Sequence, residues 1–441
     1  MSARSTALDV LIACRKQAAW SNGVLKDYID RDRLDRRDAA LATRLCYGVL
    51  QNRSLLDFYL SQLLTGKVKD LHPAVRDILH LGVYQIVCMD KIPDSAAVNE
   101  SVGLAKKYCR RQSFAPGLVN AVLRSCVRTK DTLAQPKSLA ERYSHPQKLV
   151  KLLEESVGRQ RLEPMLEANN RTPPTVVQVN TLRTTLEQLK AALEAEEVMA
   201  QPHPWMPDCL ILTNTGSVEK LKAFRDGWFY VQDAAAKLCV SCARIPQGAE
   251  VRVLDCCSAP GGKSFAAVIA MGGSGRIDSA DIHPHKTTLI ERGAERLGFS
   301  NIHAQVQDAT QEKQEWIGQM DIVLADVPCS GYGIIRKKPD IRYKDPAEME
   351  QLPQLQLKIL EVQSRYVKPG GVLLYSTCTV LKRENEAVVE AFLRSHPEFT
   401  TEPLALPAVL PENESGMLTL LPGEYDTDGF FICRLRRKAS T

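Results

Sequence analysis

Apolar residues recur at helical spacing through the first part of the chain. Val75, Ile78, Leu79 and Gly82 follow Pro73 at the three- and four-residue steps that put side chains on one face of a helix. The same spacing returns behind later prolines, and no convincing strand alternation occurs in this part of the sequence. The pattern predicts an all-α bundle over residues 1–140.

The hydrophobic pattern changes twice further along the chain. Residues 141–235 mix helical spacing with short apolar runs, which predicts a small α+β segment. From residue 236 to 441, short apolar runs alternate with longer helical stretches, and this alternation predicts a parallel, doubly wound sheet of the Rossmann-like α/β class. The predicted strands cover residues 251–254, 302–306, 322–325 and 372–375, and the predicted helices cover residues 264–271, 285–297, 347–367 and 383–395.

Charge and composition refine this picture. The net charge of the 441 residues is +5, but residues 1–140 alone hold 22 Lys and Arg against 13 Asp and Glu. A basic front favours docking on a polyanion such as nucleic acid, although solvated helix faces would give the same excess. No apolar run approaches the ~18 residues of a membrane span, and Asp9 interrupts the first apolar stretch, so we expect a cytoplasmic protein whose 13 cysteines are thiols.

A glycine-containing turn follows the first predicted strand of the α/β region. Residues 255–264 read Asp-Cys-Cys-Ser-Ala-Pro-Gly-Gly-Lys-Ser. Paired glycines let the backbone approach a ligand, and the helix that follows offers free amide groups. A P-loop would need glycine where Cys257 stands, and the three-glycine dinucleotide fingerprint is also missing. A nucleoside cofactor without a pyrophosphate remains, and S-adenosylmethionine is the commonest of these.

Two aspartates follow the next two predicted strands. Asp281 comes about 20 residues after the glycine turn, where a carboxylate can accept hydrogen bonds from both ribose hydroxyls. Asp308 is placed to meet an adenine amino group. Either aspartate alone would more often be a turn or cap residue, but together with the glycine turn they favour an S-adenosylmethionine site.

Two cysteines are expected at neighbouring strand ends. Cys329 follows Asp326 by three residues after one strand, and Cys378 follows the next strand. Most cysteines in such cores are inert, yet this set fits methylation of cytosine at C5. That carbon becomes nucleophilic only after a thiolate adds to C6. An acid near N3 promotes the addition, and a base must later remove the C5 proton.

Residues 255–263, 326–331 and 376–378 resemble the RNA cytosine-C5 methyltransferases of the NOL/NOP/Sun group, and the resemblance extends over about residues 145–441. It implies that Cys378 is the nucleophile and that Cys329 assists product release. It also implies that Asp326 contacts the target base and the cofactor side, and that Lys263 orients the cofactor or Asp326. The implied S-adenosylmethionine contacts are Cys257, Ser258, Ala259, Pro260, Gly261, Gly262, Lys263, Asp281, Asp308 and Asp326. Asn385 matches the last position of a recurrent Glu-Glu-Asn, whose first position is here Arg383.

Residues 99–107 and 117–124 resemble the helical RNA-binding domain of the antitermination factor NusB, which one bacterial subgroup joins to this methyltransferase. The resemblance implies 16S ribosomal RNA or an early small-subunit particle as the partner, with cytosine 967 in RNA numbering as the target. We expect a monomer that binds no membrane and no metal, because the Cys239–Cys242 pair lacks the two further ligands of a zinc site. Three basic residues just beyond the Pro-Cys loop, Lys337, Lys338 and Arg342, are expected beside the active site, either holding phosphates or in an exposed turn.

Two rival functions remain open. A non-catalytic RNA-binding or ribosome assembly factor would use the NusB-like front and keep the cofactor fold as a scaffold, but it would not need Asp281, Asp326, Cys329 and Cys378 together. A DNA cytosine methyltransferase would attack with Cys329 instead. The essential cysteine discriminates between the two chemistries.

Overall fold

The computed structural model describes residues 2–17, 21–247 and 250–439. These residues form two compact units. The helical unit comprises residues up to 155 together with 159–170 and 335–344, and the sheet unit comprises residues 156–158, 171–334 and 345–441. None of the helices in the described ranges is both long and apolar enough to cross a membrane.

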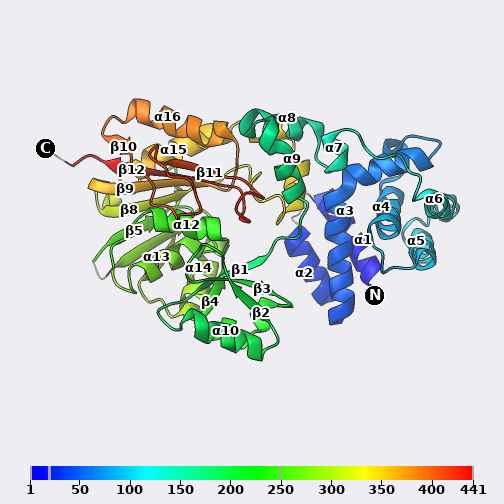
Figure 1. The fold of residues 1–441 in the computed structure, drawn as a ribbon, viewed down its shortest axis with the longest axis horizontal. Coiled ribbons are helices and arrows are strands. Elements are labelled where there is room, and N and C mark those ends of the chain that lie inside the picture. Colours follow the sequence, from blue (N-terminus) through cyan, green and yellow to red (C-terminus); the bar gives the residue numbers. More distant parts are fainter. Residues whose placement is uncertain (1, 18–20, 248–249, 440–441) are drawn as a thin grey trace. The chain divides into compact units, whose positions relative to one another are not determined.

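The helical unit is built around α4, whose apolar residues are almost all buried. Figure 1 shows α1 to α6 as a bundle in blue and cyan, which confirms the predicted helical front. Its elements are α1 (Ala3–Gln17), α2 (Ser21–Arg31), α3 (Arg36–Leu63), η1 (Val68–Asp70), α4 (Pro73–Cys88), α5 (Asp94–Tyr108), α6 (Ala115–Thr129), α7 (Leu139–Arg142), α8 (Gln147–Val157), α9 (Arg159–Ala168) and η4 (Pro339–Tyr343).

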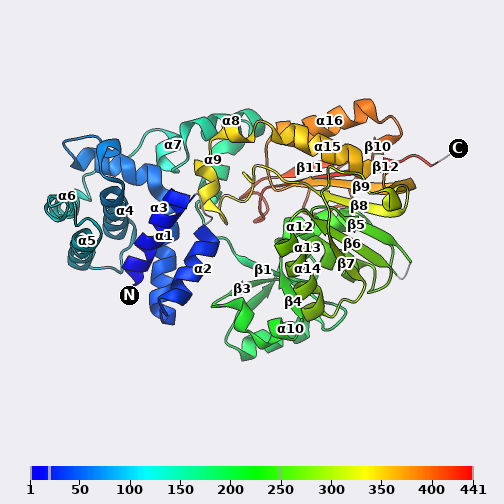
Figure 2. The same ribbon diagram turned by 180° about the vertical axis from the view of Figure 1, so that it is seen from behind.

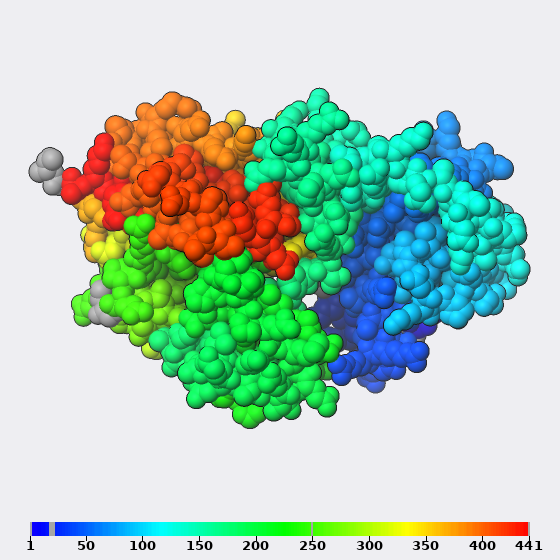
Figure 3. Space-filling model, in the orientation of Figure 1, coloured from blue at the N-terminus to red at the C-terminus, as the bar shows by residue number. Residues whose placement is uncertain are grey.

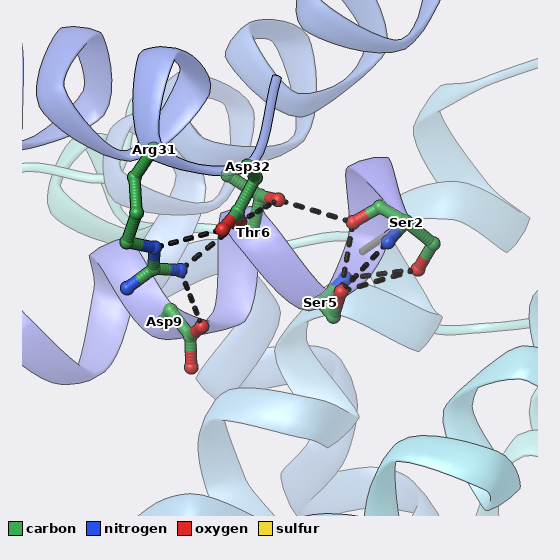
Figure 4. Close-up of polar contacts among 6 residues, drawn as sticks. All are labelled: Ser2, Ser5, Thr6, Asp9, Arg31 and Asp32. Carbon is green, nitrogen blue, oxygen red and sulfur yellow. Dashed lines mark hydrogen bonds and ion pairs between the residues drawn. The ribbon is translucent and has the colours of Figure 1, made fainter. Parts of the chain in front are cut away.

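Charged contacts tie α2 to α1. Arg31, at the end of α2, binds Asp9 of α1 at 3.0 Å and the neighbouring Asp32 at 2.7 Å (Figure 4). Asp32 also accepts a hydrogen bond from Thr6 at 2.6 Å. These bonds fix the point at which the chain leaves α2.

Arg342 differs from the sequence-based expectation. It is fully buried within the helical unit, so it neither lies in an exposed turn nor offers its charge to phosphates. Its guanidinium donates to the carbonyl oxygens of Gln51 at 2.9 Å and Ser144 at 3.1 Å, and to the side-chain oxygen of Asn170 at 2.9 Å. Residues 335–344 therefore pack with the helical unit, although they follow the Pro-Cys segment in the chain.

A four-stranded antiparallel sheet opens the sheet unit, in the strand order β2-β3-β1-β4. This sheet with α10 confirms the predicted mixed α+β segment. Thr185 starts α10 with a capping box completed by Gln188, which satisfies two backbone donors at the helix start. The elements are β1 (Thr175–Val179), α10 (Leu186–Ala195), β2 (Met199–Pro202), β3 (Cys209–Thr213), η2 (Val218–Lys220), α11 (Lys222–Arg225) and β4 (Phe229–Val231).

The larger sheet has the order β10-β12-β9-β8-β5-β6-β7, with β11 paired to β12. Strands β5 to β9 are parallel and confirm the Rossmann-like prediction. Strands β10, β11 and β12 add antiparallel pairs beyond β9, which the alternation of apolar runs and helical stretches did not predict. The elements are α12 (Ala234–Cys242), β5 (Arg252–Asp255), α13 (Gly262–Ala270), β6 (Arg276–Asp281), α14 (Pro284–Leu297), β7 (Ile302–Val306), η3 (Gln314–Trp316), β8 (Met320–Asp326), η5 (Pro346–Met349), α15 (Leu352–Ser364), β9 (Val367–Thr377), η6 (Lys382–Glu384), α16 (Glu386–Ser395), β10 (Phe399–Thr401), β11 (Met417–Leu420) and β12 (Phe430–Arg437).

Helices cover both faces of the larger sheet. α12, α13 and α14 lie against one face, and α15 and α16 lie against the other (Figure 2). Successive residues of each strand point to opposite faces, so Val253 joins the core under α12 to α14 and Leu254 the core under α15 and α16. Within the sheet unit, the segment before β12 (orange to red in Figure 3) lies beside the middle segment, and Trp205 donates to the carbonyl oxygen of Tyr425. The domain limits at residues 140 and 235 stay predictions.

Candidate active site

The turn after β5 is fixed by backbone hydrogen bonds to the neighbouring strands. Cys256 donates to the carbonyl oxygen of Leu324 in β8 at 3.1 Å, and Ser258 donates to that of Ala280 in β6 at 2.9 Å. Gly261 adopts φ +111°, and a Cβ there would lie 2.5 Å from the ring of Phe265. Only glycine fits this position. α13 begins directly at the turn, and its N-cap residue Gly261 has no side chain to cap the first amides.

Lys263 and Asp326 form an ion pair at the carboxyl edge of the sheet. Their Nζ and Oδ2 atoms are 2.6 Å apart, and the Lys263 ammonium lies 5.0 Å from the centre of the Phe430 ring. Burial lowers the pKa of Lys263, but Asp326, Cys239 and Asp255 together raise it by more, so that the pKa lies above its ordinary value and the side chain stays a cation. Ser376 donates to the other carboxylate oxygen, Oδ1, at 2.8 Å. The direction of the Asp326 carboxylate is thus fixed from two sides.

Asp255 is a second, fully buried carboxyl group behind the turn. Its Oδ2 accepts a hydrogen bond from Ser264 at 2.8 Å, and no partner for Oδ1 exists among the described residues. Burial raises the pKa of Asp255 to about 7, against the smaller opposing effects of Ser264 and Lys263. The group therefore titrates near neutrality.

The ends of β6 and β7 carry the two predicted nucleoside contacts. Asp281 is buried and accepts a hydrogen bond from the amide of His283 at 3.0 Å. Asp308 accepts hydrogen bonds from the amide and the hydroxyl of Thr310, both at 2.8 Å. Sequence reasoning did not single out Ile282, a large apolar residue that is 53% exposed next to Asp281. The signal in the sequence was an isoleucine directly after Asp281, the last residue of β6.

Cys329 and Cys378 come together as their strand positions predicted. Their sulfur atoms are 3.2 Å apart. The hydrogen bond with Cys378 raises the pKa of Cys329 well above its ordinary value, and burial and the negative charges of Glu384 and Asp326 raise it further. Cys329 is consequently a thiol at neutral pH and can donate its proton to the sulfur of Cys378.

The backbone of Cys378 is held by a glycine pair. Gly333 donates to the carbonyl oxygen of Cys378 at 2.9 Å and accepts from the amide of Gly429 at 2.8 Å. A Cβ on Gly333 would overlap the carbonyl oxygen of Gly429. Close backbone approach therefore requires glycine at position 333.

The structure brings Lys263, Asp326, Cys329 and Cys378 to one edge of the sheet, and the roles assigned to them stay predictions. Cys239 and Cys242 are buried on α12. Within the described ranges, no three His, Cys, Asp or Glu side chains are arranged to hold a metal ion.

Comparison with known proteins identifies the family. Family models match residues 244–436 as "16S rRNA methyltransferase RsmB/F", residues 1–128 as the NusB family and residues 145–219 as an RsmF/B-like ferredoxin-like domain. A Bacillus subtilis protein described as a probable ribosomal RNA small subunit methyltransferase B is 36% identical over 99% of both chains. The chain belongs to the RsmB/F family of rRNA methyltransferases.

Solved structures share the fold of this chain. The crystal structure of a protein named PH0851 matches with a TM-score of 0.81 at 25% identity, over 95% of this chain and 94% of that one. The structure of NSun6 from Pyrococcus horikoshii with SFG matches with a TM-score of 0.60 at 20% identity, over 67% of this chain and 99% of that one, and shows the fold alone. The S-adenosylmethionine-dependent methyltransferase fold of the sheet unit is thereby established.

Proposed function

We propose that this protein methylates C5 of a cytosine in 16S ribosomal RNA with S-adenosylmethionine, through a covalent bond between Cys378 and C6 of the base. Resemblance to the family suggests cytosine 967, in RNA numbering, as the target. The observation that carries the proposal is the pair of sulfur atoms 3.2 Å apart, at the edge where Lys263 fixes Asp326. The names of the curated relatives support ribosomal RNA as the substrate class.

The cofactor residues fit S-adenosylmethionine, which supplies an electrophilic methyl group when bound. The first amides of α13, behind Gly261, suit the carboxylate of its methionine part, because a helix N-terminus favours anions. Asp281 would accept hydrogen bonds from the ribose hydroxyls, and Asp308 from the adenine amino group. The exposed side chains of Ile282 and Val306 would cover the faces of the adenine ring. A neighbour of known structure whose description includes an S-adenosylmethionine analogue supports this assignment.

The two cysteines would perform different steps. The Cys378 thiolate forms a bond to C6, and the electron pair of the C5–C6 double bond moves toward N3, where a proton or hydrogen bond stabilises it. C5 then takes the methyl group. A base removes the C5 proton, the electron pair restores the double bond, and the bond between C6 and sulfur breaks. Cys329, held as a thiol beside Cys378, is placed to assist this last step by protonating the leaving sulfur.

Asp326 would hold the base during these steps. Its carboxylate is 28% exposed and both oxygens already accept hydrogen bonds, from Lys263 and Ser376, so it needs no reorientation when the base enters. A base within a duplex cannot present C6 to a thiolate, so the target must be unpaired or flipped out. The basic helical unit would supply affinity for the RNA backbone.

The test is transfer of a labelled methyl group from S-adenosylmethionine to unmodified 16S ribosomal RNA, with the product base mapped. Label on C5 of one cytosine supports the proposal. No transfer to free RNA or to small-subunit particles by folded protein would favour the assembly factor. Transfer to DNA, with Cys329 as the essential residue, would favour the DNA methyltransferase.

A further inference from the structure

Glu384 and Asn385 are adjacent in the chain. Asn385 bonds to the residues on both sides of Cys378. Glu384 does the same for Cys329 with the help of Gln356. Both side chains are fully buried where η6 meets α16. Both match the last two positions of the recurrent Glu-Glu-Asn family sequence, which by itself assigns neither of them a role in this chain. Their contacts differ completely, although only one peptide bond separates them.

Asn385 holds the turn that carries Cys378. Its Oδ1 accepts a hydrogen bond from the hydroxyl of Thr377 at 2.6 Å, and its Nδ2 donates to the carbonyl oxygen of Thr379 at 3.1 Å. Asparagine at a helix start ordinarily caps the helix with its side chain. In the described structure Asn385 makes no such bond to α16, because both ends of its amide are used on the two neighbours of Cys378.

Glu384 and Gln356 hold the turn that carries Cys329. Glu384 Oε2 accepts from the amide of Ser330 at 2.9 Å and from Nε2 of Gln356 at 2.9 Å. The same Nε2 donates to the carbonyl oxygen of Pro328 at 2.9 Å. The residues before and after Cys329 are therefore joined through two buried side chains. Gln356 comes from the middle of α15, which anchors this turn to the rigid core.

One further bond connects the two turns. The hydroxyls of Ser330 and Thr379 lie 2.8 Å apart, each directly after its cysteine. The separation of the two sulfur atoms thus depends on Asn385 on one side and on Glu384 with Gln356 on the other. A displacement of about 1 Å at a reacting group can cost about 100-fold in rate.

We infer that Asn385 and Glu384 are positioning residues for two separate steps of the reaction. Asn385 positions Cys378 for addition to the base, and Glu384, with Gln356, positions Cys329 for release of the methylated RNA. This inference rests on the proposed function, since it assigns parts of that reaction. It predicts that loss of the Asn385 side chain slows addition to the base and that loss of the Glu384 side chain traps the covalent RNA adduct.

The experiment measures two quantities on the full-length protein with unmodified 16S ribosomal RNA. These are the methyl transfer rate in a single turnover and the fraction of protein covalently bound to RNA on a denaturing gel. Glu384→Ala should accumulate adduct at least about tenfold above wild type, as the proposed function also predicts for Cys329→Ala. Gln356→Ala should do the same. Glu384→Gln keeps an acceptor for Ser330 and should restore release.

Asn385→Ala should lower the single-turnover rate at least about tenfold without accumulating adduct and without changing KM for S-adenosylmethionine. Combined with Cys329→Ala, it should reduce the adduct that Cys329→Ala alone accumulates. Thr377→Val removes one of the same two bonds and should act in the same direction if Asn385→Ala does not fold. Glu390→Ala, an exposed glutamate on α16, is the matched control and should change neither quantity.

The outcomes separate this inference from the function on which it rests. If wild type transfers no methyl group, the proposed function and this inference both fail. If wild type methylates and Cys329→Ala traps RNA while Glu384→Ala and Gln356→Ala do not, only this inference is overturned. Parallel loss of rate and adduct in all variants, with no restoration by Glu384→Gln, would show that the two residues merely stabilise the fold.

Discussion

Asp255 makes the stability of the sheet unit depend on pH in a way that can be calculated. The carboxyl group is fully buried, its pKa is raised to about 7, and its ordinary pKa in an unfolded chain is about 3.9. Below pH ~4 both states carry the proton. As the pH rises from there, the unfolded chain releases the proton and the folded protein keeps it. The free energy of unfolding therefore falls until the pH passes about 7.

The slope follows from proton linkage. One proton bound only by the folded state costs about 1.4 kcal/mol for each pH unit, and this slope flattens as the folded group itself titrates near pH 7. The loss is therefore roughly 2 kcal/mol between pH 5 and 7, with little change above that. Asp255→Asn has no proton to lose, so the difference between wild type and this variant isolates the single group. Ser264→Ala keeps the carboxyl group but removes the side-chain hydrogen bond that lowers the pKa of Asp255. The loss of stability with rising pH should therefore continue to a higher pH in this variant.

Urea titrations at closely spaced pH values between 5 and 8 measure this difference. Trp316 is buried against the same sheet and reports unfolding by its fluorescence. The free energy of unfolding of wild type should fall relative to Asp255→Asn as the pH rises, and the two curves should run parallel above pH ~7.5. If the two curves were parallel over the whole pH range, or if wild type gained stability relative to Asp255→Asn as the pH rose, Asp255 would not be protonated in the folded protein as described.

Three further variants test contacts elsewhere in the chain. Arg342→Ala leaves the buried carbonyl oxygens of Gln51 and Ser144 without their donor and should lower the free energy of unfolding by about 3 kcal/mol. Hydrogen exchange of α3 should accelerate, and unchanged protection of α3 would contradict the anchoring role of Arg342. Gly333→Ala should slow methyl transfer and cost about 1–3 kcal/mol of stability, because the added Cβ would meet the carbonyl oxygen of Gly429. Gly103→Ala, on an open face of α5, is the control, and equal effects of the two substitutions would argue against a close approach at Gly333. Lys263→Met removes the cation from Asp326 and should lower the methyl transfer rate about tenfold or more, whereas the same substitution at the exposed Lys358 of α15 should leave the rate unchanged. A Lys263→Met variant as active as wild type would exclude a role for the Lys263–Asp326 ion pair.

Much of the sheet unit could be predicted from local sequence because strand ends are marked by the change from apolar to polar residues. β7 has the predicted bounds, and Cys329 and Cys378 meet because parallel strands end at one edge. The helix predicted over 347–367 is shorter, because residues 346–349 form the separate turn η5 and α15 runs only from Leu352 to Ser364.

Other features depend on partners that no local pattern shows. The antiparallel β12 reads as an apolar run, and only its pairing with β9 sets its direction. Arg342 is basic and precedes a polar stretch, which locally indicates exposure, but carbonyl oxygens from distant helices surround it. Glu384 and Gln356 are ordinary helix-forming residues in the sequence, and their contact with the Cys329 turn exists only in the folded chain.

The most direct test of the central claim is to find which sulfur atom bonds to the base. RNA that contains 5-fluorocytosine at the target has no proton at C5 to remove, so the reaction should stop after methyl transfer with the base still attached to the nucleophile. Digestion of the trapped complex and mass spectrometry of the peptides should place a methylated nucleotide on Cys378, and Cys378→Ala should give no complex. A nucleotide on Cys329, or trapping that persists in Cys378→Ala, would contradict the account.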